Sequence, residues 1–324
     1  MSPGTAAAAV PARLTPPPAL PPRVPFVYIL GAGHSGSTLL TLLLGSHPRI
    51  CTIGEVKAPA IGAPDEYPCS CGERIAACRF WRELSREVAA RGARLDIAGG
   101  ATDIRRAPTA YLRRLLRPLH RGPAVEAIRD AALRLSPEWR GFLDRFQTLH
   151  AAVVTAACTI TGKDVFVDSS KTGVQLKYLL ANPRLDVKVI RLVRDGRGVS
   201  LSYRASEGFT FEAGARAWRR ANEEADSVVA ALPRERWYDL RYETLCREPE
   251  ATLAALAAFI GVEPLDLRAY SAGPIQHVLG NNKARLRADE IRLDERWRRT
   301  LTPEDLHLFD RVAGDVNRRY GYDG

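Results

Sequence analysis

The sequence lacks long hydrophobic runs and is poor in cysteine and lysine. No stretch approaches 18 consecutive apolar residues, so no integral membrane segment is expected. Six cysteines among 324 residues are too few for a disulfide scaffold, and a reducing, cytoplasmic compartment is expected. Only six of the 47 basic residues are Lys and the other 41 are Arg; the formal net charge of +10 predicts an anionic ligand or surface.

Residues 1–25 contain eight Pro and six Ala, which predicts a disordered, semi-extended tail. The Pro run at residues 16–18 would interrupt the apolar helix of a signal peptide, so no export signal is expected. Over the whole chain, 46% hydrophobic and 26% charged residues are typical of a globular protein. Residues 26–324 are therefore expected to form one domain.

Strand and helix patterns alternate along this domain. The apolar run at residues 26–30 ends at Gly31, and the Leu-rich segment 38–44 follows it, which predicts a strand, a glycine loop and a buried helix. The alternation predicts an α/β fold of three layers, P-loop-like, with a mainly parallel central sheet that binds ligands at the carboxyl ends of its strands. Later segments continue the alternation of strands and helices, with strands over 165–167, 187–193 and 237–241 and a helix near 173–180.

Two other stretches are predicted to be helical. Residues 80–150 carry no clear strand and indicate a helical insertion, which extends from about residue 69 to 150 and is expected to lie on the acceptor side. Residues 303–320 predict a final helix with Thr302 as its N-cap and two acidic residues in its first turn.

Residues 31–38, GAGHSGST, fit the G-x-x-x-x-G spacing of a phosphate loop. Glycines allow successive backbone N–H groups to converge on one anion, and the helix N-terminus adds a favourable dipole. Ser37, followed by Thr38, stands where nucleoside triphosphatases have their phosphate-binding Lys, so the loop suits a smaller, diester-like anion. By itself the pattern also fits a plain turn between strand and helix.

This loop and the Leu-rich segment resemble the 5′-phosphosulfate loop of sulfotransferases that use 3′-phosphoadenosine 5′-phosphosulfate (PAPS). The strand at 187–193 runs into Arg194, with Ser202 eight residues later, which resembles the family's 3′-phosphate site. The segment 240–245, LRYETL, is similar to the RYEDL segment before a late helix of these enzymes. The three elements occur in family order, and the chain resembles a bacterial member similar to the tyrosylprotein and carbohydrate types.

The resemblance implies PAPS as co-substrate, with no metal required, and transfer of its sulfuryl group to a hydroxyl or amine. It places the phosphosulfate on the loop, the 3′-phosphate on an Arg and a Ser, and further contacts on a Tyr and a late basic loop. The implied donor-binding residues are Gly33, His34, Ser35, Gly36, Ser37, Thr38, Arg194, Ser202, Tyr242, Lys283 and Arg285.

Glu55 is the candidate base, because the related enzymes have their catalytic glutamate at this relative position in a similar Gly-Glu context. A solvated loop carboxylate paired with Lys57 is the alternative. Related loops usually carry Arg or Lys where this chain has His34, so either a protonated His34 contacts the phosphosulfate or another cation compensates. Lys171, directly after a predicted strand, is that other cation. Its alternatives are a residue on a helix surface and a partner of Asp168.

Cys69, Cys71 and Cys78 allow a zinc site, a disulfide or a plain structural loop. Cys51 could supply a fourth sulfur to a metal. Zinc sites normally contain C-x₂₋₄-C pairs. A C-x-C pair with one distant Cys differs from this spacing, so no metal is expected.

No motif identifies the acceptor. We expect a small molecule, a sugar or a peptide that the insertion binds. The basic run at residues 113–117 lacks the interleaved aromatics of a single-strand binder, so no nucleic-acid partner is expected. Two other functions fit the pattern: a nucleotide kinase or triphosphatase with a degenerate phosphate loop, and a non-catalytic nucleotide-binding protein. The sequence carries no signal for an oligomeric state.

Overall fold

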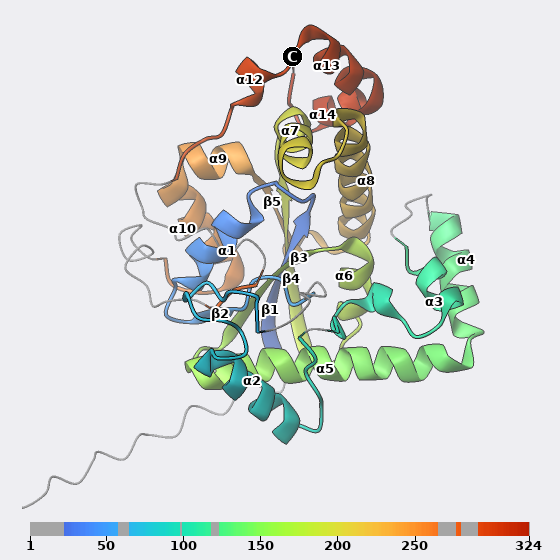
Figure 1. The fold of residues 1–324 in the computed structure, drawn as a ribbon, viewed down its shortest axis with the longest axis vertical. Coiled ribbons are helices and arrows are strands. Elements are labelled where there is room, and N and C mark those ends of the chain that lie inside the picture. The colour runs from blue at the N-terminus through green and yellow to red at the C-terminus, as the bar shows by residue number, and fades with distance from the viewer. Residues whose placement is uncertain are drawn as a thin grey trace, which may run out of the picture.

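A computed structural model describes residues 23–57, 65–97, 99–117, 123–264, 277–279 and 291–323, and Figure 1 shows its fold. Its central sheet has five strands: β1 (Val24–Gly31), β2 (Ile50–Thr52), β3 (Val165–Lys171), β4 (Leu185–Val193) and β5 (Trp237–Arg241). Their order is β2-β3-β1-β4-β5, and all neighbouring pairs are parallel.

Strand β1 shows why the sheet is the middle layer. Phe26, Tyr28 and Leu30 lie in one hydrophobic core, and Val27 and Ile29 lie in a second core on the opposite face. Successive side chains of a strand point to opposite faces, so a strand covered on both faces needs a continuous apolar run. The run predicted at residues 26–30 meets this requirement.

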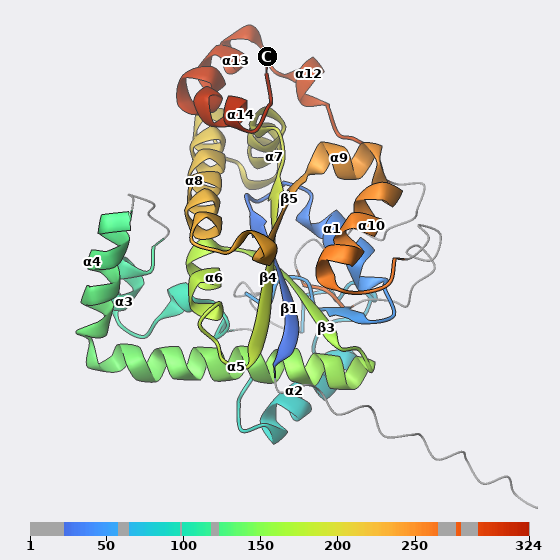
Figure 2. The ribbon, with the colours of Figure 1, turned by 180° about the vertical axis from the view of Figure 1, so that it is seen from behind.

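Helices form the two outer layers, as Figures 1 and 2 show from opposite sides. One face packs against α5 (Pro137–Thr161), α6 (Gly173–Leu179) and α8 (Phe211–Ala230), and the other against α1 (Ser37–Gly45), α9 (Tyr242–Arg247) and α10 (Pro249–Ile260). The predicted three-layer, P-loop-like α/β class is confirmed.

The described part of the chain between β2 and β3 contains helices and no strand, as predicted. Besides α5 these are α2 (Arg79–Ala90), the short η1 (Ile104–Arg106), α3 (Ala110–Leu115) and α4 (Pro123–Arg134). The long α5 packs under one end of the sheet, and α2 packs against it (Figure 2).

The C-terminal segment packs on α7 (Gly196–Glu207) and α8 through a third core that contains Trp218 and Phe309. Thr302 is the predicted N-cap, and it forms a capping box with Asp305. The predicted last helix is interrupted by a π-helical turn, Asp310–Gly314. The remaining elements are η2 (Arg234–Arg236), α12 (Trp297–Thr300), α13 (Pro303–Phe309) and α14 (Asp315–Arg319).

Strand β2 was not predicted from the sequence, because three residues are too short for a periodic pattern. The predicted tail lies, up to residue 22, outside the described residues. Among the helices that the structure describes, none is long and apolar enough to cross a bilayer.

Candidate active site

The ends of three adjacent strands meet at the predicted site. In the register of the sheet, Leu30 of β1 lies opposite Lys171 of β3, and Gly31 lies opposite Leu192 of β4. The loop after β1 therefore lies between the end of β3, which carries Lys171, and the end of β4, which leads into Arg194. This is the carboxyl edge at which open parallel sheets bind ligands.

The loop between β1 and α1 turns through two residues with positive φ, His34 at 60° and Gly36 at 90°. A Cβ on Gly36 would lie 2.4 Å from the ring of Tyr242, so a side chain does not fit there. The N-terminus of α1 has no side-chain cap and no acidic residue in its first turn. The buried Ser35 hydroxyl has no hydrogen-bond partner among the described residues. Free N–H groups and an unpaired buried hydroxyl fit an anion here.

The other loop positions line the same turn. Gly33 lies against the hydroxyl of Tyr203, which would be 2.6 Å from a Cβ at this position. Ser37 and Thr38 open α1, and Ser37 is buried. Ser35, Gly36, Ser37 and Thr38 therefore form one continuous rim at the helix start.

Arg194 lies on the β4 side of the loop with its guanidinium buried. Its Nη1 donates to the carbonyl of His34 at 2.9 Å, and its Nη2 donates to the carbonyl of Asp294 at 3.0 Å and to its carboxylate at 3.1 Å. The guanidinium carbon lies 4.5 Å from the centroid of the Tyr242 ring. Because Tyr242 touches both Gly36 and Arg194, it joins the loop to the β4 end.

Ser202 lies on α7, on the face that borders Arg194. A Cβ on Gly198 would be 3.5 Å from Nη2 of Arg194, so Gly198 lies on the face of α7 that borders Arg194. Ser202 is one turn further along, and its hydroxyl donates to the Gly198 carbonyl at 2.9 Å. Residues four apart share a helix face, so Ser202 and Gly198 face the same region.

Glu55 lies on the β3 side of the loop, between two lysines. Its Oε1 accepts a hydrogen bond from Nζ of Lys171 at 2.5 Å, and its Oε2 is 3.7 Å from Nζ of Lys57. Burial raises the pKa of Glu55, but the two ammonium groups outweigh burial and hold the pKa below its ordinary value. Glu55 is therefore an ionised carboxylate at neutral pH and can accept a proton.

Lys171 is held in an uncommon backbone conformation. Its φ is 65°, and it and His34 are the two non-glycine residues with positive φ in the part of the chain that the structure describes. Its Nζ also donates to the carbonyl of Ser169 at 2.9 Å. Strained residues tend to gather at functional sites, and both strained residues here border the same loop.

Asp168 and Lys57 are site residues that the sequence interpretation did not assign. Asp168 is buried on β3, and its Oδ1 accepts from the backbone N–H groups of Val56 at 3.1 Å and Ser170 at 2.8 Å. Burial raises the pKa of Asp168 to about 6. Asp168 therefore fixes the segment that carries Glu55 against β3. The sequence VDSSK at residues 167–171 contains Asp168, but no local pattern indicated that the segment with Glu55 packs against these residues.

The side chain of His34 contacts α7. Its Nε2 lies 2.8 Å from Oε1 of Glu207, and its ring meets the Tyr203 ring edge-on at 4.6 Å between centroids. Burial raises the pKa of Tyr203 to about 12, so its hydroxyl stays protonated at neutral pH. The cations that touch Glu55 are Lys171 and Lys57, while the imidazole is paired with a carboxylate of α7.

Two predicted donor contacts, Lys283 and Arg285, lie outside the described residues. The proposal of Cys51 as a fourth sulfur beside Cys69 is wrong. Cys51 is buried in β2 and does not belong to the group that contains Cys69, Cys71 and Cys78.

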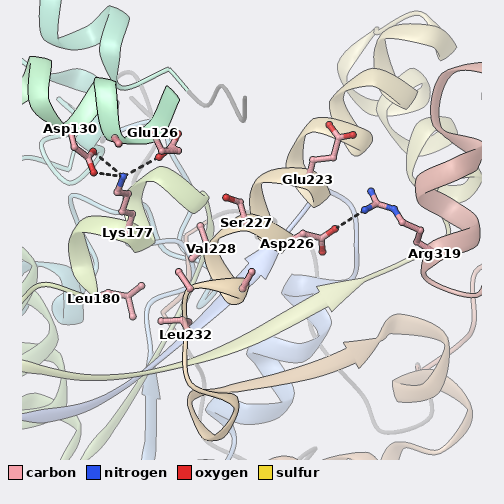
Figure 3. A pocket seen from close by; sticks show the side chains of 13 residues that line it. Glu126, Asp130, Lys177, Leu180, Glu223, Asp226, Ser227, Val228, Leu232 and Arg319 are labelled. Carbon is pink, nitrogen blue, oxygen red and sulfur yellow. Dashed lines mark hydrogen bonds and ion pairs between the residues drawn. The ribbon is translucent and has the colours of Figure 1, made fainter. Parts of the chain in front are cut away.

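A cavity of about 900 Å³ lies between α4, α6 and the end of α8 (Figure 3). Each of its acidic side chains is paired with a cation: Glu126 and Asp130 with Lys177, Asp226 with Arg319, and Glu223 with Arg219. Leu180 and Leu232 line it, and they precede β4 and β5, so the cavity lies toward the amino ends of these strands. None of the predicted site residues lines it, and we assign neither donor nor acceptor to it.

A glycine loop that opens a helix at the carboxyl edge of a parallel sheet defines a phosphate-loop type of α/β protein. The sequence model of the sulfotransferase family matches residues 106–266. The structure is similar to the solved sulfotransferase domain of the Synechococcus PCC 7002 olefin synthase, with a TM-score of 0.52 and 19% identity over 95% of this chain and 98% of that one. That likeness concerns the fold.

Carbohydrate sulfotransferase 1 from Homo sapiens is 28% identical over 177 residues, and the same figures hold for the Mus musculus protein. The match covers 45% of this chain and 41% of each relative, so it spans less than half the length of these curated proteins. The chain belongs to the sulfotransferase family. The family match contains Lys171, Arg194 and Ser202, whereas the glycine loop and Glu55 precede it.

Proposed function

We propose that this protein transfers the sulfuryl group of PAPS to a hydroxyl or amine of an acceptor. The observation that carries the proposal is the sheet edge at which the glycine loop lies between Glu55, with its two lysines, and the buried Arg194. A donor with an anion at each end needs two separate anion sites, and this edge offers both. Membership in the sulfotransferase family supports the same reaction.

PAPS, when bound, supplies the sulfuryl group on a leaving phosphate. The free N–H groups at the start of α1, with Ser37 and Thr38, hold the phosphosulfate end. Arg194 holds the 3′-phosphate, because its planar fork matches phosphate oxygens, and the phosphate takes the place of the Asp294 carboxylate. Ser202, on the bordering face of α7, donates to the same phosphate.

Glu55 accepts the proton of the acceptor nucleophile, for which its depressed pKa keeps it ionised. Lys171 contacts this carboxylate and lies opposite Leu30, which precedes the loop, and its ammonium neutralises the charge that develops on the leaving phosphate. His34 borders the phosphosulfate through its backbone in the loop, while its imidazole contacts Glu207 at 2.8 Å. The acceptor is a small molecule, a sugar or a peptide, and the compartment is the cytoplasm, which the six free cysteines support.

Calorimetric titration with adenosine 3′,5′-bisphosphate, ATP and GTP tests the donor. We expect the bisphosphate to bind without added Mg²⁺. At a hundredfold excess over Kd it should increase the free energy of unfolding by about 2.7 kcal/mol, and the unfolding temperature should rise accordingly. Mg²⁺ is left out of the buffer rather than chelated, so that other metals stay in place. Turnover of ATP that depends on Mg²⁺, without bisphosphate binding, would assign the chain to the kinase or triphosphatase class.

A further inference from the structure

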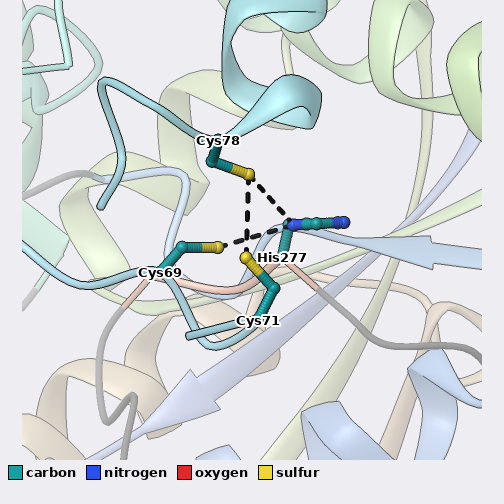
Figure 4. Close-up of side chains that lie close together, drawn as sticks. All are labelled: Cys69, Cys71, Cys78 and His277. Carbon is teal, nitrogen blue, oxygen red and sulfur yellow. Dashed lines mark hydrogen bonds between the residues drawn. The ribbon is translucent and has the colours of Figure 1, made fainter. Parts of the chain in front are cut away.

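Three cysteines and one histidine come together at the start of α2 (Figure 4). Cys69, Cys71 and Cys78 come from one short segment, and His277 comes from a segment about 200 positions later. One ligand atom from each residue lies within 4.8 Å of the other three. The sequence interpretation disfavoured a metal because a C-x-C pair with one distant Cys fits the usual C-x₂₋₄-C spacing poorly. It named Cys51 as the possible fourth ligand, whereas the structure brings His277 to the three cysteines.

Three distances between ligand atoms of this cluster match those of a tetrahedral zinc site. With Zn–S bonds of about 2.3 Å and Zn–N bonds of about 2.0 Å at tetrahedral angles, two sulfurs lie about 3.8 Å apart and a sulfur and a nitrogen about 3.5 Å apart. The Sγ atoms of Cys71 and Cys78 are 3.8 Å apart. Nδ1 of His277 is 3.5 Å from Sγ of Cys69 and 3.3 Å from Sγ of Cys78.

The surrounding structure orients three of the four ligands. Cys69 opens a tight turn in which its N–H donates to the Glu73 carbonyl at 2.7 Å. Cys78 is the N-cap of α2, and its N–H donates to the carbonyl of Arg74 at 2.8 Å. The ring of Phe80 stacks on the imidazole of His277, with centroids 4.7 Å apart and planes at 4°. A cysteine backbone held by hydrogen bonds and an imidazole held by ring stacking are supports that orient metal ligands.

We propose that Cys69, Cys71, Cys78 and His277 bind one Zn²⁺ ion as a structural site. Three thiolates and one imidazole form a closed set of four protein ligands, which is typical of structural zinc and leaves no open position for a substrate. All six cysteines of the chain are free in this structure, and the 3.8 Å between Cys71 and Cys78 is far longer than a disulfide bond of about 2.05 Å.

The zinc joins the insertion to the segment that carries Glu55. Val278 donates to the Ser70 hydroxyl at 2.9 Å, which adds a second link beside His277. Leu279 donates to the carbonyl of Ile53 at 2.8 Å, and its own carbonyl faces the N–H of Glu55 at 3.5 Å. Residues 277–279 therefore lie between the metal and the Glu55 backbone. This consequence for catalysis rests on the proposed function, whereas the metal site itself does not.

Metal analysis of the untagged full chain, purified under reducing conditions, tests the proposal. We expect about one zinc per chain in the wild-type protein. Cys71→Ser and His277→Ala should lose it, and Cys71 is the most exposed of the three cysteines, so its variant should still fold. Cys246→Ser and His307→Ala, which change the same residue types outside the cluster, should keep the full zinc content.

Replacement of zinc by Co²⁺ gives a readout that does not depend on activity. Tetrahedral thiolate ligation produces intense visible bands, which we expect in the wild-type protein and not in Cys71→Ser. A chain that contains no zinc, and that takes up neither added Zn²⁺ nor Co²⁺, overturns the proposal. So does a wild-type mass lighter by two hydrogen atoms under native conditions, because it shows a Cys71–Cys78 disulfide instead. If zinc is present and the bisphosphate does not bind, the metal site stands and the proposed function fails.

Discussion

At the scale of single residues, the proposed chemistry depends on the contact between Glu55 and Lys171. Glu55→Gln keeps the size of the side chain and removes the base. Transfer should fall by about 10² to 10⁴, while bisphosphate affinity stays the same or rises, because both lysines lose their carboxylate partner. Turnover and calorimetry measure the two effects. Glu212→Gln, an exposed carboxylate on α8, is the matched control. Unchanged turnover in Glu55→Gln would remove this residue from the reaction.

The pH dependence of kcat/KM should report the pKa of Glu55. Its pKa lies below the ordinary 4.5, so the acid limb of the profile should lie below that pH in the wild-type protein. Lys171→Met removes the nearer ammonium, and because burial alone raises the pKa, the acid limb should move to higher pH. Lys57→Met should move it less, since Lys57 is 3.7 Å from the carboxylate and Lys171 is 2.5 Å away. Profiles that coincide would show that another group is the base.

At the scale of elements, Arg194 connects the end of β4 with the loop after β1. Arg194→Ala removes a buried guanidinium that contacts His34, Tyr242 and Asp294, and bisphosphate affinity should fall by about tenfold to a hundredfold. Arg204→Ala removes a cation from α7 whose partner is Asp305, and it should change Kd by less than about twofold. Calorimetry measures both, and equal Kd values for the two variants would refute the 3′-phosphate assignment.

The elements that the sequence predicted are those with local signals. The runs at residues 26–30 and 187–193 are long and apolar, and the glycine loop between strand and helix is a contiguous motif. Strand β2 was missed because it has only three residues. The pairing of Glu55 with Lys171 needs a contact across 116 positions, and no spacing rule in one sequence supplies it. His277 was missed for the same reason, since it lies 199 positions from Cys78.

At the scale of the whole molecule, the C-terminal segment supports the proposed donor site. Asn317 of α14 is buried, and its Oδ1 accepts from the N–H of Gly196 at 2.9 Å, at the start of α7 and two residues after Arg194. Tyr322 donates to Glu243, whose other carboxylate oxygen accepts from the N–H of Asp195 at 3.1 Å. Residues near both ends of the described chain therefore shape one edge of the sheet.

Asn317→Ala should lower the free energy of unfolding by about 1 to 3 kcal/mol, because the N–H of Gly196 is left buried without an acceptor. It should also weaken bisphosphate binding, since α7 starts beside Arg194. Urea unfolding and calorimetry measure these changes. Asp315→Ala on the same helix removes an exposed pair with Arg219 and should change stability by less than about 1 kcal/mol. Equal stability of the two variants would show that this contact contributes nothing.

The backbone angles of His34 and Lys171 would separate two kinds of selection in a library of all single substitutions. At a left-handed position glycine is the least strained residue, so selection for cellular abundance should enrich glycine at both codons. Selection for sulfated product should instead retain lysine at codon 171. The difference between the enrichment of glycine in the first selection and of lysine in the second would show that the ammonium group at position 171 is kept at the expense of folding stability.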